Sequence, residues 1–146
     1  NLGSQYIQQQ FEHLNDTNRE EVIDKAKVAV MDMLKKTIRP EFLNRIDETI
    51  MFLPLTKEQI GDVVRLQLER VKDMLEPQGI ELQWTDPAIN YLSDVGYDPE
   101  FGARPVKRAI QRYVLNDLSK SLLAGTVNRD KPVIIDSFGE GLVFRN

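Results

Sequence analysis

The sequence contains no cysteine and only one histidine. These two absences exclude disulfide frameworks, thiolate metal sites and zinc sites built from several histidines. No apolar run reaches the roughly 20 residues that a membrane-spanning helix needs, and no secretory signal peptide is recognisable. The first residue is Asn and not Met, so we expect a piece of a longer protein. A cytoplasmic protein without a membrane partner is the expectation.

The sequence also lacks the excess of basic residues that is typical of nucleic-acid-binding proteins. It has 19 lysines and arginines against 23 acidic residues, a formal net charge of -4, which argues against a general nucleic-acid binder. Hydrophobic residues make up 41% and charged residues 29%, as in folded globular chains. A length of 146 residues is enough for one ordinary domain or two small ones.

The most informative stretch covers residues 96–112, with the sequence GYDPEFGARPVKRAIQR. Glycine, aspartate and proline near its beginning predict a turn. Pro105 is tolerated in the first turn of a helix, where its missing N–H has no partner to lose. A helix is therefore predicted to begin at Pro105, with Arg104 directly before it. Arg108 and Arg112 follow at four-residue spacing, which predicts that the three arginines share one face.

A cation at the beginning of a helix opposes the helix dipole, at a cost of roughly 0.3–1 kcal/mol. One interpretation is that Arg104 is presented to an anion, because a guanidinium forms a fork that suits phosphate. The alternative is an ordinary surface arginine that pairs with a carboxylate. A third interpretation takes the basic face, with Lys107 beside it, as a binding surface for nucleic acid or an acidic partner, which predicts a steep dependence on salt.

A second informative stretch is Ile38 to Glu48, in which Pro40 is expected to begin a short helical turn. Apolar residues alternate there with closely spaced charges. From the residues alone, an internal cluster of ion pairs explains these charges.

Two of these motifs resemble segments of one family. The pattern Gly-Tyr-Asp-Pro-x-x-Gly-Ala-Arg-Pro-x-x-Arg closely resembles the sensor 2 motif of the Clp family of AAA+ ATPases, and Phe-Leu-Asn-Arg-Ile-Asp resembles the arginine-finger segment of the same family. The first four residues, Asn-Leu-Gly-Ser, resemble the end of the sensor 1 strand of ClpB-type protein disaggregases. The overall resemblance is strongest to the second ATPase ring of the ClpB type.

The resemblance implies roles for five residues. Arg104, with Ala103 before it, would contact the nucleotide of its own subunit as sensor 2. Arg45 would act in trans on the nucleotide of the neighbouring subunit as the arginine finger, and Asn1 would lie near the attacking water as sensor 1. Ile60 would contact adenine.

The resemblance also implies ATP and Mg²⁺ as cofactors, a homo-hexameric ring, unfolded or aggregated proteins as substrates, and cooperating chaperones as partners. The sequence contains no glycine-rich loop ending in Gly-Lys-Ser or Gly-Lys-Thr, and no apolar strand ending in Asp-Glu, so the groups that grip phosphates and metal are missing. We therefore expect that this chain alone hydrolyses no ATP. Two alternatives are the same region of a Clp unfoldase that feeds a protease, and a purely structural oligomerisation module.

The expected fold is α+β in two parts. Residues 1–54 would form the end of a large α/β ATPase subdomain, and residues 55–146 a small lid domain with three helices and a three-stranded sheet. Residues 4–18 are expected to be either a short helix or an ordered loop, and 49–53 are a β-prone run. Hydrophobic periodicity predicts helices over 19–36, 56–76, 86–95 and 105–124 and strands over 80–84, 133–136 and 142–145.

Overall fold

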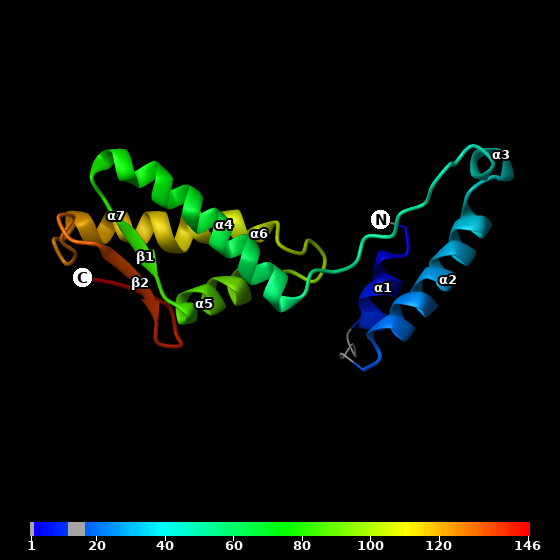
Figure 1. Ribbon diagram of the computed structural model, residues 1–146, viewed down its shortest axis with the longest axis horizontal. Coiled ribbons are helices and arrows are strands. Elements are labelled where there is room, and N and C mark those ends of the chain that lie inside the picture. Colours follow the sequence, from blue (N-terminus) through cyan, green and yellow to red (C-terminus); the bar gives the residue numbers. More distant parts are fainter. Residues whose placement is uncertain (1, 12–16) are drawn as a thin grey trace. The chain divides into compact units, whose positions relative to one another are not determined.

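The computed structural model describes residues 2–11 and 17–146, and the chain divides into two compact units, Asn1–Pro54 and Leu55–Asn146. The described residues of the first unit form α1 (Ser4–Phe11), α2 (Arg19–Thr37) and α3 (Pro40–Leu43) (Figure 1). The second unit contains α4 (Lys57–Leu75), η1 (Glu76–Gln78), β1 (Leu82–Trp84), α5 (Asp86–Gly96), α6 (Pro105–Ile110), η2 (Gln111–Leu115), α7 (Asn116–Leu123), β2 (Val133–Ser137) and β3 (Leu142–Arg145).

The first unit is a pair of helices with a short helical turn after them. The predicted helix over 19–36 is confirmed as α2, and part of the uncertain stretch before it is helical as α1. Among the described residues of this unit, only Ile7 and Ala26 are buried. The β-prone run 49–53 forms no strand, because a strand needs a hydrogen-bonding partner and the described part of this unit offers none.

The second unit begins with a capped helix. Thr56 Oγ1 accepts a hydrogen bond from Gln59 N at 3.2 Å, and Gln59 Oε1 accepts one from Thr56 N at 2.9 Å. This reciprocal capping box satisfies two backbone donors that a helix leaves unpaired at its beginning. Gly79 follows α4 and η1 with φ of +75°, a left-handed conformation that ends helices at little cost for glycine.

The predicted arginine helix is one continuous rod made of α6, η2 and α7 (Figure 1). Its middle segment, η2, is a π-helix, in which Asn116 N donates to Gln111 O. Such wider turns are rare and are usually short insertions within α-helices. Arg108 therefore lies in an α-helical segment, whereas Arg112 lies in the π-helical segment that follows it.

The sheet has the strand order β1-β2-β3. β1 pairs in parallel with β2, with Leu82 opposite Val133, and β2 pairs antiparallel with β3, with Ile135 opposite Phe144. The strands predicted over 133–136 and 142–145 are confirmed, and they pair as a hairpin. Three helical rods and a three-stranded mixed sheet give the predicted α+β fold class.

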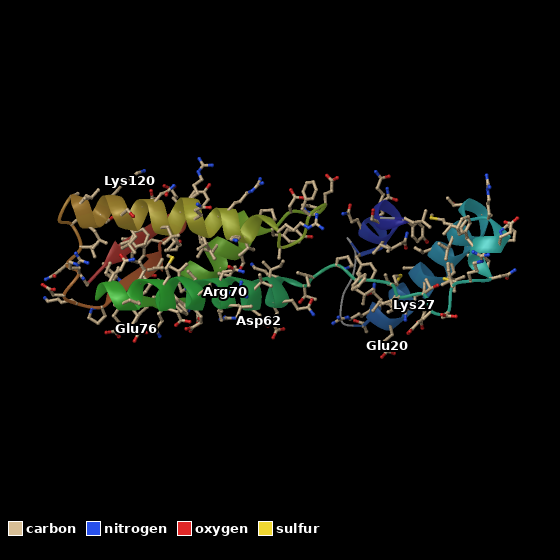
Figure 2. The ribbon with its side chains drawn as sticks, turned by 90° about the horizontal axis from the view of Figure 1, so that it is seen from above. Glu20, Lys27, Asp62, Arg70, Glu76 and Lys120 are labelled. Atoms are coloured by element: carbon tan, nitrogen blue, oxygen red, sulfur yellow. The ribbon has the colours of Figure 1, made fainter. Side chains whose placement is uncertain are left out.

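The core of the second unit lies where the apolar faces of its helices meet one face of the sheet. Asp62, Arg70 and Glu76, labelled in Figure 2, are exposed. Alternation of buried and exposed positions along α4 is what an amphipathic helix produces when one stripe faces the core. The core residues with the least exposure are Ile60, Val64, Leu68, Leu82, Ala88, Ile89, Leu92, Val106, Val114, Leu118, Val133 and Ile135.

Candidate functional site

A closed turn links α5 to α6 and ends at Arg104. Asp98 N donates a hydrogen bond to Gly102 O at 3.0 Å, and Gly102 N donates one to Asp98 O at 2.6 Å. Gly102 has φ of +63°, a left-handed conformation that glycine adopts without the strain a side chain would add. The turn therefore has a fixed shape between the two helices.

The side chain of Asp98 closes the same turn from the inside. Its Oδ1 accepts hydrogen bonds from Glu100 N at 2.8 Å and from Phe101 N at 3.0 Å, the arrangement of an Asx turn. Phe101 O in turn accepts from Arg104 N at 3.3 Å. Hydrogen bonds thus connect Asp98 to the residue that carries the guanidinium.

The two ends of the turn are also held by a close contact between α5 and α6. A Cβ atom on Gly96 would lie 2.9 Å from Cγ2 and 3.0 Å from Cα of Val106. Only glycine therefore allows the end of α5 to approach the beginning of α6 this closely. Gly96 and Val106 are both buried, so the contact is part of the core.

Arg104 directly precedes Pro105, the first residue of α6, as the sequence predicts. Its side chain is exposed, and it forms no ion pair with any residue that the structure describes. The interpretation of Arg104 as a surface arginine paired with a carboxylate thus finds no partner in residues 2–11 and 17–146. Arg112 differs, because its guanidinium lies 5.3 Å from the ring centroid of Tyr113, a cation–π contact.

A cavity of about 370 Å³ opens between the beginning of α4 and the end of α5. Ile60 lies in the first turn of α4 and is 1% exposed, so it forms an apolar wall. At the other side, Lys57 Nζ lies 3.6 Å from Asp94 Oδ1. The cavity is lined by Leu55, Lys57, Ile60, Ser93, Asp94 and Tyr97.

The cavity and the turn offer groups that suit a flat ring and an anion. A volume of about 370 Å³ lies within the range of roughly 300–1,000 Å³ that ligand pockets occupy. Apolar walls beside the ring of Tyr97 suit a flat ring, and a guanidinium that forms no ion pair with residues 2–11 and 17–146 suits an anion such as phosphate. Tyr97 lines the cavity and begins the turn that ends at Arg104, so the two features are joined through the backbone.

Of the residues that line the cavity, the sequence analysis singled out Ile60 and no polar residue. Tyr97 lies in the stretch that resembles the sensor 2 motif, so this stretch carried a signal for it. Lys57 and Asp94 come from different helices, and no local pattern links them. Their proximity follows only from the packing of α4 on α5.

Arg45 lies in the first unit, directly after α3. Its N–H donates to Phe42 O at 3.1 Å, and its side chain is exposed. Neither Arg45 nor Asp47 or Glu48 forms an ion pair within the described residues. The internal cluster of ion pairs, which was the alternative for this stretch, is thus not formed there. Asn1 lies outside the described residues.

Metal ligands and membrane-spanning helices were sought over residues 2–11 and 17–146. This part of the chain contains no group of three or more His, Asp or Glu side chains that could hold a metal ion. None of its helices is both long enough and apolar enough to cross a membrane.

The comparison with known proteins identifies the family. Residues 55–135 match the family model described as the C-terminal, D2-small domain, of ClpB protein. The chain belongs to the ClpB family. It is 66% identical over all 146 residues to the chaperone protein ClpB of Bacteroides thetaiotaomicron, and 49% identical over the same length to that of Porphyromonas gingivalis. It is 44% identical over 93% of its length to chaperone protein ClpB3, mitochondrial, of Oryza sativa subsp. japonica.

The predicted ClpB membership is confirmed. The chain spans 17% of the length of the two bacterial relatives and 14% of the rice protein. The ClpB D2-small domain match falls within the unit Leu55–Asn146. This unit contains the cavity, the closed turn and Arg104, whereas Arg45 precedes the matched residues.

Proposed function

We propose that this chain is the C-terminal part of an ATP-driven ClpB protein disaggregase, and that its second unit senses the nucleotide of its own subunit. One observation carries the proposal: Arg104 presents a guanidinium that forms no ion pair with the described residues, at the end of a closed turn that begins beside the cavity lined by Ile60. In this assignment Arg104 contacts the phosphates, Ala103 lies against them through the backbone, and Ile60 contacts adenine.

The chemistry of phosphoryl transfer explains why an arginine is needed. Negative charge is spread over the phosphoryl oxygens in the transition state, and preorganised cations stabilise it. Arg104 supplies two N–H donors in one plane, and its permanent charge does not depend on pH near neutrality. When ATP becomes ADP, the number of phosphate contacts changes, and the position of α6 with it. This coupling would move the lid.

Two further residues, Arg45 and Asn1, are proposed to act on nucleotide. Arg45 acts in trans on the nucleotide of the neighbouring subunit, which requires a homo-hexamer or another closed ring. Its exposed side chain, without an ion pair in the described residues, supports this role. Asn1 is proposed to orient the attacking water through its side-chain amide.

ATP and Mg²⁺ are the proposed cofactors of the complete protein. The cavity and Arg104 suit the base and phosphates of ATP, whereas the described residues offer no cluster of oxygen ligands for the metal. The proposed substrates are unfolded or aggregated proteins, with cooperating chaperones as partners. Neither nucleic acid nor a membrane is a proposed partner, and the cytoplasm is the proposed location, although one relative is named as mitochondrial.

A Clp unfoldase that feeds a protease is the competing function. The relatives that are 66% and 49% identical to this chain are both named chaperone protein ClpB, which favours the disaggregase. The features described here, Arg104 and the cavity, would serve both.

The test uses full-length ClpB that carries this chain, with the first ATPase ring silenced. Arg45→Ala and Arg104→Ala are made separately, and Arg70→Ala, an exposed arginine on α4, is the matched control. Arg45→Ala should keep nucleotide binding and ring assembly but slow hydrolysis on the order of a thousandfold. Arg104→Ala should weaken nucleotide binding about tenfold, the effect of losing one charged hydrogen-bonding group. Nucleotide affinity, sedimentation and steady-state hydrolysis are measured.

Arg70→Ala should behave as the wild type in all three measurements. If both Arg45→Ala and Arg104→Ala also behave as the wild type, the arginines take no direct part in the chemistry. The chain would then be a lid and assembly module.

A further inference from the structure

The closed turn between α5 and α6 fixes the backbone of Arg104 through backbone hydrogen bonds, a side-chain cap from Asp98 and a close packing contact at its ends. We propose that Asp98 is a positioning residue for Arg104, which sets where the guanidinium meets the nucleotide phosphates without touching the nucleotide itself. This inference rests on the proposed function of Arg104. In this inference, Asp98 and its turn link Arg104 to α5 and α6.

The first step of the argument is the use of the Asp98 carboxylate. Its Oδ1 accepts from two consecutive backbone donors, Glu100 N at 2.8 Å and Phe101 N at 3.0 Å. This oxygen therefore organises the turn. A carboxylate would also repel phosphate, so a direct contact with the nucleotide is not its role. Only an acceptor oxygen is needed at this position, and an amide oxygen supplies one as well.

The second step is the path from Asp98 to Arg104. The backbone of Asp98 is paired in both directions with Gly102, and Arg104 N donates to Phe101 O at 3.3 Å. Phe101 is held at its N–H by Asp98 and at its carbonyl by Arg104. Loss of the Asp98 side chain would release Phe101 N and leave the Arg104 backbone with a less fixed partner.

The third step is the clamp at the ends of the turn. Gly96 and Val106 approach so closely that a Cβ on Gly96 would lie 3.0 Å from Val106 Cα. A displacement of Arg104 by the nucleotide is thus transmitted to α5 and α6 together, because the turn cannot absorb it by changing shape. The closed turn thus converts a contact between Arg104 and the phosphates into movement of α5 and α6, as allosteric coupling through a rigid element requires.

The experiment compares Asp98→Ala with Asp98→Asn in full-length ClpB carrying this chain, with the first ring silenced. The probe is ADP or a slowly hydrolysed ATP analogue, and its dissociation constant is measured. Asp98→Ala should weaken binding about tenfold, because two backbone hydrogen bonds are lost. Asp98→Asn keeps the acceptor and should stay within about twofold of the wild type. In an Arg104→Ala background, Asp98→Ala should add no more than about twofold, because the group that it positions is absent.

The matched control is Asn128→Ala. Asn128 Oδ1 accepts from Asp130 N at 2.8 Å, so this substitution removes a similar turn-closing bond in the same unit, far along the chain from the sensor arginine. Nucleotide affinity should not change. A second variant, Gly102→Ala, strains the left-handed turn at φ of +63° and should weaken binding in the same direction. Thermal unfolding of each variant shows whether it is folded.

The outcomes separate this inference from the proposed function. If Arg104→Ala leaves affinity unchanged, the sensor assignment itself fails. If Arg104→Ala weakens binding but Asp98→Ala does not, only the positioning role of Asp98 fails. The positioning role also fails if the effects of Asp98→Ala and Arg104→Ala are additive, if Asp98→Asn is as damaging as Asp98→Ala, or if Asn128→Ala has the same effect.

Discussion

Two helices of equal length, one in each unit, differ in how many of their residues are buried. α2 and α4 both contain 19 residues and both carry apolar stripes. α4 buries a full stripe that includes Ile60, Val64 and Leu68, whereas α2 buries only Ala26. An amphipathic pattern specifies which face a helix offers, but the core forms only where other apolar faces meet it. The second unit supplies those faces from its own residues.

The described part of the first unit leaves its apolar face open. A groove there is lined on its apolar side by residues of α1 and α2 and by the extended run after α3, namely Leu2, Ile7, Val30, Met31, Leu34, Ile50, Met51 and Phe52. Residues 49–53 do not close it with a strand. The second unit is thus expected to be stable by itself and the first unit is not.

The largest expected effect comes from separating the two units. Residues 55–146, expressed alone, should show a cooperative thermal transition, because their core is complete. Residues 1–54 alone should show none, since they bury too little apolar surface to offset the loss of chain entropy. Circular dichroism during heating measures both. A cooperative transition for residues 1–54, or its absence for residues 55–146, would contradict the comparison.

A smaller effect is expected from the same substitution made in each unit. Leu68→Ala removes a fully buried side chain of α4 and should destabilise the second unit by about 2–5 kcal/mol. Leu34→Ala removes a half-buried side chain from the groove of the first unit and should cost less than about 1 kcal/mol. The single tryptophan, Trp84 in β1, reports unfolding of the second unit in urea.

Leu34→Ala is the internal control for that measurement. The Trp84 transition should move with Leu68→Ala and stay in place with Leu34→Ala. Equal shifts of the Trp84 transition by the two substitutions would show that the two units unfold together. The second unit would then not be stable independently of the first.

The sequence predicted those elements whose signals are local. The helix predicted from residue 56 begins with the capping box of Thr56 and Gln59, two residues only three positions apart, and Pro105 begins α6 as predicted. The turn chemistry of residues 96–104 also placed Arg104 directly before its helix. In each case the residues that specify the structure lie within a few positions of one another, so their interaction does not depend on the rest of the fold.

Features that depend on distant residues were not predicted. The π-helical segment was missed because its apolar residue Val114 and the flanking Ile110 and Leu118 fit one α-helical stripe in the sequence. The parallel pairing of β1 with β2 joins residues far apart in the sequence. Nor did the pattern show that Lys57 and Asp94 meet at the cavity, because packing of two helices brings them together.

The smallest expected effect concerns ion pairs in the two units and their response to pH. In the second unit, Asp136 is 8% exposed. Its Oδ1 accepts hydrogen bonds from Thr85 Oγ1 at 2.7 Å and from Ser137 N at 2.8 Å. Its Oδ2 lies 3.1 Å from Arg145 Nη2. The Thr85 hydroxyl, followed by these other partners, lowers the pKa of Asp136 below its ordinary value of 3.8.

Because the pKa of Asp136 is lower in the folded than in the unfolded state, the unfolded state binds the proton more readily. The carboxylate therefore stabilises the second unit above pH 3.8, and this contribution is lost as pH falls through the lowered pKa. Asp136→Asn should make the urea midpoint reported by Trp84 less dependent on pH in this acidic range. The first unit's counterpart is Glu21, 2.9 Å from Lys25 and exposed; Glu21→Gln should not move the Trp84 midpoint, since exposed pairs contribute little. An unchanged acid response in Asp136→Asn would show that the Asp136 carboxylate does not govern it.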